Sequence, residues 1–197
     1  MNSYVDLVIV GTLLWDAWLE RKSPTSNARL RYQQAHPKHD GRFYHVFEYL
    51  KSMCASGPKS FFRTDKRTGT TYGINMFSTR ALPIFTKYHS LFYNIYGGRK
   101  KVPQNIASLI TPVAFAFWIA DDGNFRFGLY LNTQGFTRKE SLLLLRNSIN
   151  NNFDLNSYLV LDSRNLHMIY VPAADMPKVR SLVLPHLHTS VHYKLGL

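Results

Sequence analysis

Two apolar runs dominate the pattern of hydrophobic and polar positions, one in each half of the chain. Residues 6–19 read DLVIVGTLLWDAWL and residues 110–123 read ITPVAFAFWIADDG. Both runs are apolar on every side, so they predict buried helices. Small residues in both runs allow close approach between two such helices: Gly11 and Ala17 in the first, and Ala114, Ala116 and Ala120 in the second. Each run contains an aspartate near its end, Asp16 or Asp122, about half the chain apart. The pattern therefore predicts two packed helices that each end in a carboxylate.

The segments that follow the two runs also match each other. Alternating segments predict strands, amphipathic segments predict helices, and turn residues separate further hairpin patterns. In the first half these segments are 28–34, Arg42–Met53, 60–80 and Ile84–Tyr96; in the second half they are 126–134, Arg138–Asn150, 157–172 and Asp175–Leu184. Thr137 and Glu140 predict a capping box at the start of one helix. Each half reads αββαββα, which predicts a duplicated α+β fold with repeats at 1–98 and 110–197 and a basic linker at 99–109.

The amino-acid composition predicts a polyanionic partner. The 197 residues include 24 Lys and Arg against 12 Asp and Glu, a formal charge of +12, while 45% of the residues are apolar. Such a chain builds a core, which excludes a disordered basic tail, and its charge points first to nucleic acid. A structural ribosomal protein or an anionic-membrane binder shares this composition. Cys54 is the only cysteine, which excludes a disulfide framework and a zinc ribbon, and no apolar run is long enough to span a bilayer.

The two aspartates are candidate metal ligands. Carboxylates brought together at a junction of apolar helices repel each other, and cations between them relieve the repulsion. Mg²⁺ prefers carboxylate and water oxygens, and beside a phosphodiester it supports hydrolysis. The alternative is that each aspartate caps a helix or pairs with a neighbouring base. The repetition of the motif in a basic protein favours the metal.

The alternating segments are candidate nucleic-acid contacts. One face of segment 28–34 carries Arg29, Arg31 and Gln33, and one face of segment 126–134 carries Arg126, Tyr130, Asn132 and Gln134. Arg and Gln on one face of a β-ribbon suit base contacts in a major groove, whereas Arg63 and Arg80 suit phosphates. An ordinary solvated sheet face is the alternative for either strand alone.

Two further clusters receive other interpretations. His186, His188 and His192 resemble a metal site, but Pro185 and the missing acidic or cysteine partners argue against zinc. The aromatic residues at near-helical spacing are interpreted as core rather than as a base-stacking platform: Phe85, Tyr88, Phe92, Tyr93 and Tyr96.

Together, GTLLWDAWL and AFWIADDG resemble the two signature helices of single-chain LAGLIDADG homing endonucleases of organellar introns. LNTQGFT (131–137), RKKVPQNI (99–106) and HYKL (192–195) resemble other stretches of that family. The resemblance implies a pseudo-twofold fold with saddle-shaped antiparallel sheets that lie in the DNA major groove. It also implies Mg²⁺-dependent cleavage of both strands of double-stranded DNA.

Carried over residue by residue, the resemblance places the metal-binding acids at Asp16 and Asp122. It places the basic residues near the reacting phosphate at Lys100, with Lys101 as the alternative, and at Lys194. It further implies a monomer with internal pseudo-symmetry, no membrane, and an organelle-encoded protein of the mitochondrion or chloroplast; the N-terminal residues show no basic or Arg/Ser-rich leader.

One position departs from the family pattern. Trp15 stands before Asp16, where the family has a small or acidic residue. This departure favours the alternative function: a non-catalytic RNA-binding protein on the same fold, as a group I intron maturase or a component of an organellar ribosome or other ribonucleoprotein. A DNA binder that has lost cleavage is the third hypothesis.

Overall fold

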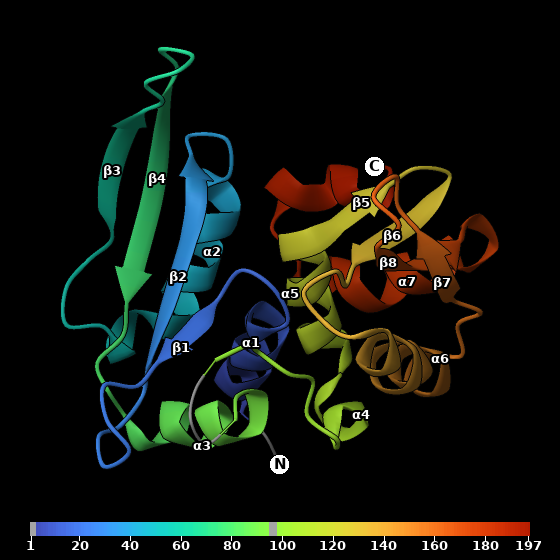
Figure 1. Ribbon diagram of the computed structural model, residues 1–197. Helices are drawn as coiled ribbons and strands as arrows, with labels where there is room; N and C mark the ends of the chain where they lie inside the picture. Colours follow the sequence, from blue (N-terminus) through green and yellow to red (C-terminus); the bar gives the residue numbers. More distant parts are fainter. Residues whose placement is uncertain (1–2, 95–97) are drawn as a thin grey trace. The chain divides into compact units, whose positions relative to one another are not determined.

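The computed structural model describes residues 3–94 and 98–197 of the chain. Contacts group the chain into two compact units, one of Met1–Trp15 with Ser90–Leu197 and the other of Asp16–His89. Each unit contains one four-stranded antiparallel sheet with its own helices (Figure 1). The compact units divide the chain at different positions from the two sequence repeats, and the repeat boundaries therefore stay a prediction.

The unit of Asp16–His89 is built on the first sheet. Its strands are ordered β1 (Trp18–Glu20), β2 (Arg29–His36), β4 (Thr71–Ser78) and β3 (Lys59–Thr64). Helix α2 (Asp40–Leu50) covers one face and continues as a 3₁₀ turn over Lys51–Met53. The rings of Tyr32, Phe43 and Phe77 pack against one another between the helix and the sheet, with centroids 5.5–6.0 Å apart. Burial of this face leaves the opposite face of the sheet to solvent.

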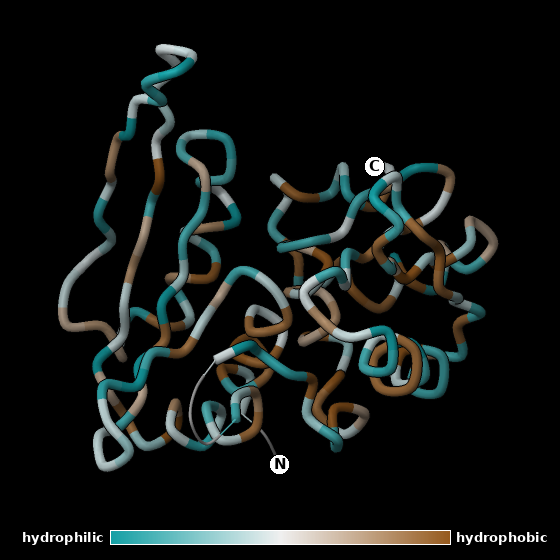
Figure 2. The backbone as a smooth tube through the Cα atoms, viewed as in Figure 1, coloured by the Kyte–Doolittle hydropathy of each residue, from teal (hydrophilic) through white to brown (hydrophobic). Residues whose placement is uncertain are grey.

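The other unit has two apolar helices at its centre, α1 (Tyr4–Leu13) and α5 (Pro112–Asp122). A methyl group added at Gly11 would lie 2.4 Å from the carbonyl oxygen of Ala114 and 2.7 Å from Cβ of Phe117. Only glycine therefore permits this backbone approach. Ser3 and Thr111 cap the two N-termini by accepting backbone hydrogen bonds. In Figure 2, where the backbone is coloured by hydropathy, these two helices are predominantly hydrophobic.

The second sheet belongs to the same unit as α1 and α5. Its strands are ordered β5 (Gly123–Phe125), β6 (Gly128–Asn132), β8 (His167–Pro172) and β7 (Tyr158–Leu161), the same order as in the first sheet. Strand β5 continues directly from the C-terminus of α5. Helix α3 (Pro83–Phe92) crosses the division between the units. A π-helical segment (Glu140–Arg146) leads into α6 (Asn147–Phe153). The remaining helical elements are α4 (Ile106–Leu109), α7 (Met176–Val183) and 3₁₀ turns at Ala173–Asp175, Leu184–His186 and Thr189–Leu195.

The predicted α+β architecture is confirmed, with differences at element ends. The first apolar run does not stay helical to its aspartate: α1 ends at Leu13, and Trp18–Glu20 form a strand that the apolar pattern concealed. Strand β6 begins at Gly128, so Arg126 lies in the turn between β5 and β6 rather than on a strand face. The capping box of Thr137 and Glu140 is confirmed by reciprocal hydrogen bonds of 2.8 and 3.2 Å.

The predicted aromatic core is also confirmed where the structure describes it. Phe85, Tyr88, Phe92 and Tyr93 are all buried, while Tyr96 lies outside the described residues. Among the helices of the described residues, none combines the length and the apolar character needed to cross a membrane.

Candidate acidic site and nucleic-acid interface

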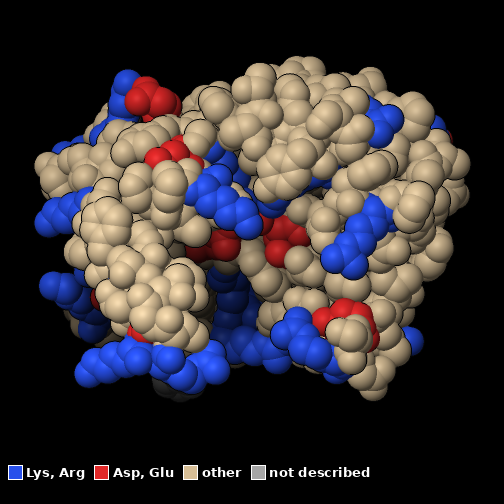
Figure 3. Space-filling model, turned by 90° about the horizontal axis from the view of Figure 1, so that it is seen from above, with Lys and Arg blue, Asp and Glu red and all other residues tan. Residues whose placement is uncertain are grey.

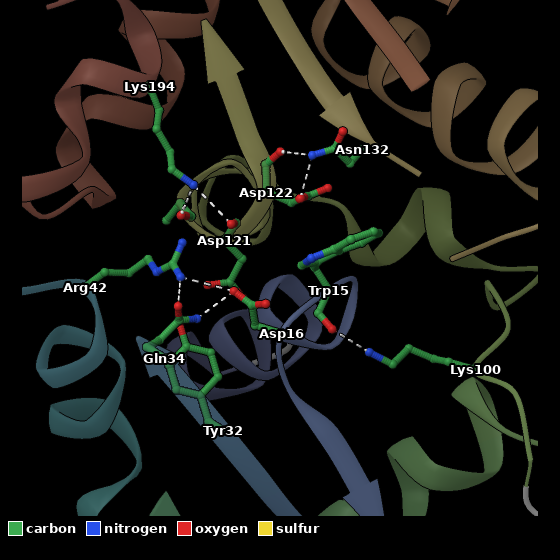
Figure 4. A network of polar contacts seen from close by, with 11 residues as sticks. Trp15, Asp16, Tyr32, Gln34, Arg42, Lys100, Asp121, Asp122, Asn132 and Lys194 are labelled. Atoms are coloured by element: carbon green, nitrogen blue, oxygen red, sulfur yellow. Dashed lines mark hydrogen bonds and ion pairs between the residues drawn. The ribbon is translucent and has the colours of Figure 1, made fainter. Parts of the chain in front are cut away.

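Asp122 is the last residue of α5 and is only 8% exposed. Asn132 at the end of β6 donates a 2.8 Å hydrogen bond from Nδ2 to Oδ1 of Asp122. The helix delivers the carboxylate to the point where β5 departs, and the amide from the neighbouring strand fixes its orientation (Figure 4). Such a hydrogen bond to one carboxylate oxygen is the usual outer-shell support of a metal-binding carboxylate.

Asp16 begins the other compact unit, three residues after the end of α1. Gln34 of β2 donates a 2.6 Å hydrogen bond to Oδ2 of Asp16, and Arg42 of α2 lies 3.2 Å from the same oxygen. Arg42 also donates to the amide oxygen of Gln34. The side chain of Arg42 is only 5% exposed, and this carboxylate and this amide both hold its guanidinium.

The two predicted lysines bind backbone carbonyls next to the two aspartates. Lys194 Nζ donates to the carbonyl oxygens of Ala120 and Asp121 at 2.6 and 3.0 Å, at the C-terminal end of α5. Lys100 Nζ donates to the carbonyl oxygen of Trp15 at 2.8 Å. A cation at the carbonyl end of a helix is favoured by the helix dipole. Both ammonium groups are thereby anchored at the residue that directly precedes a predicted metal ligand.

Gln34 and Arg42 are functional candidates that sequence reasoning missed. The sequence prediction gave Gln34 no role and took Arg42 only as the start of the helix predicted over Arg42–Met53. The available signal was a polar side chain at a position whose neighbours are core residues, because a buried amide requires a hydrogen-bond partner. Gln34 is 6% exposed and Arg42 is 4% exposed.

The donor set suits a hard divalent cation. Each aspartate is oriented by hydrogen bonds to one oxygen, and a carboxylate binds such a cation through as little as one oxygen. No group of three or more His, Cys, Asp or Glu side chains comes together within residues 3–94 and 98–197. His186 lies against Tyr4, and His188 accepts a hydrogen bond from the backbone of Ser190.

Trp15 lies near the loop after β6. Its ring atom Cζ3 lies 3.6 Å from the position of a Cβ at Gly135, and Trp15 lines a small hollow with Leu14, Lys100 and Phe136. Arg99 donates two hydrogen bonds to the carbonyl oxygen of Gly135, at 2.7 and 2.9 Å. These contacts fasten the segment that carries Lys100 to the loop after β6.

The solvent face of the first sheet carries the predicted residues Arg29, Arg31 and Gln33. Arg29 forms a 2.7 Å ion pair with Glu20 of β1, and Arg31 lies 3.5 Å from the same carboxylate. The hydrogen bond from Arg29 lowers the pKa of Glu20, which stays ionised. The carboxylate thus holds two guanidinium groups side by side on the sheet, whereas Gln33 is exposed next to them.

The predicted contacts of the second sheet divide into two groups. Tyr130 lies on the solvent face of β6, and Arg126 is exposed in the preceding turn. Asn132 and Gln134 are already bonded within the protein, Asn132 to Asp122 and Gln134 to Asp162 at 2.9 Å. The amide nitrogen of Asn132 is therefore committed to the acidic site, and its role as a base contact stays a prediction.

Arg63 and Arg80 have different surroundings. Arg63 lies on exposed strand β3, near the turn that contains Lys66 and Arg67. Arg80 donates to the carbonyl oxygens of Ser52 and Met53 at 2.9 and 3.4 Å, which ties it to the end of the 3₁₀ turn after α2. Lys and Arg atoms are much more widespread than Asp and Glu atoms on the face shown in Figure 3.

Comparisons with known proteins identify the family of the chain. The sequence model of the family described as "LAGLIDADG DNA endonuclease family" matches residues 7–179. A cytochrome b mRNA maturase bI2 of Debaryomyces hansenii is 27% identical, over 96% of this chain and 72% of that protein. The DNA endonuclease I-ChuI of Chlamydomonas applanata is 25% identical, over 96% of this chain and 93% of that protein.

A solved structure gives the same fold. The homing endonuclease I-WcaI bound to its DNA recognition sequence superposes with a TM-score of 0.88, at 23% identity, over 98% of this chain and 86% of that one. The fold is that of a duplicated α+β homing endonuclease. The chain belongs to the LAGLIDADG DNA endonuclease family.

Proposed function

We propose that this protein is a site-specific double-stranded DNA endonuclease of the homing type, which hydrolyses phosphodiesters with Mg²⁺. The observation that carries the proposal is the pair of supported aspartates. At each aspartate an amide from the second strand of the sheet binds the carboxylate, and a buried or half-buried lysine binds the carbonyl of the preceding residue.

The metal would be held by Asp16 and Asp122. When bound beside a phosphodiester, Mg²⁺ lowers the pKa of water and stabilises the charge on the leaving oxygen. Gln34 and Asn132 keep the two carboxylates oriented, and Arg42 places a guanidinium against Asp16.

Lys100 and Lys194 supply positive charge close to the aspartates. Each is held by backbone carbonyls, so it keeps its position before the substrate arrives. Charges fixed in advance stabilise charge that develops on a reacting phosphate without reorganisation at the moment of reaction.

The sheet faces and the net charge support duplex binding. Arg29, Arg31, Gln33, Tyr130 and Arg126 present hydrogen-bonding groups suited to base edges, and Arg63 suits phosphates. The excess charge of +12 makes binding dependent on salt, because bound cations are released from the DNA. We further propose that the protein acts as a monomer, without a membrane, and that it is encoded in an organelle, specifically the mitochondrion.

A plasmid library that carries randomised inserts tests the proposal directly. With Mg²⁺ the protein is expected to linearise a subset of plasmids with a shared sequence, and the double variant Asp16→Asn/Asp122→Asn is expected to linearise none. Asp154→Asn is the matched control. It is the same chemical change at a carboxylate that lies outside the site and is 95% exposed.

Cleavage that persists in the double variant would refute the proposed site. The alternative function, RNA binding without cleavage, predicts that the wild-type protein linearises no plasmid. Failure to cut any plasmid, together with copurification of intron or ribosomal RNA from native extract, would refute the endonuclease and support the RNA-binding protein.

A further inference from the structure

An apolar row crosses the solvent face of the first sheet. Ala35 of β2 is paired with Ile74 of β4, and Ile74 is paired with Phe61 of β3, so the three side chains stand next to one another on one face. The inward face is marked by the buried residues Tyr32 and Phe77. Because successive residues of a strand alternate between faces, the row lies on the side opposite α2.

This row is accessible to a partner. Phe61 is 47% exposed, Ala35 is exposed, and Tyr72, on the same face one pair further along β4, is 53% exposed. An antiparallel sheet with one solvated face normally carries polar residues there. Contiguous apolar side chains on such a face mark a binding surface.

Positive charges flank the row and identify the kind of partner. Lys59 and Arg63 are two residues before and after Phe61 on β3, so they share its face. Lys66 and Arg67 follow in the turn, where they line a shallow hollow together with Arg63 and Tyr72. The occupant of this surface therefore presents an apolar feature between negative charges.

We propose that the row of Ala35, Ile74 and Phe61 reads thymine methyl groups in the major groove. This inference rests on the proposed DNA-binding function and names its specificity. The C5-methyl of thymine is the apolar group that a base pair displays in the major groove, and apolar side chains contact it. Lys59 and Arg63 then contact the phosphates on either side, which sets the position of the row on the duplex.

The second sheet carries a different row, so the preference for thymine methyl groups is expected in only one half of the target site. The row at its centre consists of Tyr130, Tyr170 and Tyr158, whose rings lie 4.6 and 5.3 Å apart and carry hydroxyl groups. Hydroxyls exchange hydrogen bonds with base edges and do not depend on a methyl group. Thymine methyls are therefore expected to matter in one half of the target site and not in the other.

Deoxyuridine scanning measures this directly. A bound sequence is first selected from a randomised duplex library, and each thymine is then replaced singly by deoxyuridine, which removes only the methyl. At one or more positions confined to one half-site, the Kd of the wild-type protein is expected to rise about fourfold per methyl, the value of one buried methylene-sized group.

Variants assign the effect to the row. In Phe61→Ala/Ile74→Ala the loss at those positions is expected to fall to less than twofold. Phe62→Ala is the matched control, because Phe62 is the next residue of the same strand, is 68% exposed and faces the other side of the sheet. This control is expected to keep the full deoxyuridine effect.

The outcomes separate the two proposals. Selection of a sequence whose thymines are all replaceable without loss, or a deoxyuridine effect that persists in the double variant, overturns this inference and leaves the DNA-binding function standing. Dimerisation that Phe61→Ala abolishes while DNA affinity is unchanged assigns the row to a second copy and also overturns it. Failure to select any sequence overturns both.

Discussion

The first sheet and the second sheet share one strand order, yet they carry different side chains on their solvent faces. The first presents paired arginines beside Glu20 and an apolar row around Ile74. The second presents a row of tyrosines, and burial together with the neighbouring Tyr130 and Tyr158 raises the pKa of Tyr170. The strand order depends on buried residues, so the exposed faces of the two repeats are free to specialise for different partners.

The acidic sites differ less than the sheets do. In both repeats an amide binds the aspartate: Gln34 binds Asp16 and Asn132 binds Asp122. At both aspartates a lysine also binds the carbonyl of the preceding residue, Lys100 at Trp15 and Lys194 at Asp121. The carboxylate, its amide and this lysine are thus the common part of the two sites, and at Asp16 the guanidinium of Arg42 lies against the carboxylate as well.

The largest expected effect tests the common part. Asp16→Asn and Asp122→Asn are each expected to reduce the rate of double-strand cleavage about 100-fold or more, since each removes a proposed metal ligand and a charge. Plasmid linearisation measures the rate, and duplex binding without divalent metal is expected to change less than threefold. A single variant that cleaves at the wild-type rate would show that the two repeats are not equivalent.

The next effect separates the two cations. Arg42→Met leaves the half-buried carboxylate of Asp16 without its guanidinium and is expected to destabilise the fold by about 2 kcal/mol. Lys194→Met removes hydrogen bonds to carbonyls and is expected to cost about 1 kcal/mol. Urea denaturation measures both. In an Asp16→Asn background the cost of Arg42→Met is expected to shrink, and an unchanged cost would contradict the ion pair.

A smaller effect depends on pH. Burial raises the pKa of Glu140, but hydrogen bonds from Thr137 and from the backbone of Val102 outweigh it, so the pKa lies below its usual value. Glu140→Gln is expected to destabilise the fold by about 1 kcal/mol at pH 7. Because the folded pKa is lowered, this difference is expected to disappear as pH falls from the ordinary glutamate range through that lower value.

Glu20→Gln in the first repeat is the comparison for that experiment. The carboxylate of Glu20 is 37% exposed, so screening limits the value of its pairing with Arg29 to about 0.5 kcal/mol. Chemical denaturation at pH 7 and again at acidic pH measures both variants. A larger loss of unfolding free energy for Glu20→Gln than for Glu140→Gln would contradict the expected order.

A stability effect of the opposite sign concerns the turn between β5 and β6. Phe127 has φ = 55° and is 90% exposed, whereas the other non-glycine residues with positive φ are Asp154 and Asn165 among the described residues. Aspartate and asparagine tolerate this conformation better than phenylalanine does. Phe127→Asn is therefore expected to raise the free energy of unfolding by up to about 1 kcal/mol. Asn165→Phe in the β7–β8 turn is the reverse control and is expected to lower it.

The sequence predicted the elements with strong local signals. The apolar runs, the capping box of Thr137 and Glu140 and the alternation along β2 each follow from a few neighbouring residues. The end of α1 at Leu13 and the strand Trp18–Glu20 were missed, because an apolar run looks the same in a buried helix and in a buried strand. The short strand β5 was concealed for the same reason, directly after α5.

The sequence by itself determined the duplicated architecture, the basic character and the two aspartates, since repetition and composition are properties of the chain alone. The tertiary structure decided which side chains support those aspartates. Gln34 and Arg42 reach Asp16, and Lys194 reaches the end of α5, only because strand pairing and helix packing bring residues distant in the sequence together. It also decided that Ala35, Ile74 and Phe61 form one row, because strand register is set by pairing between strands and not by any one of them.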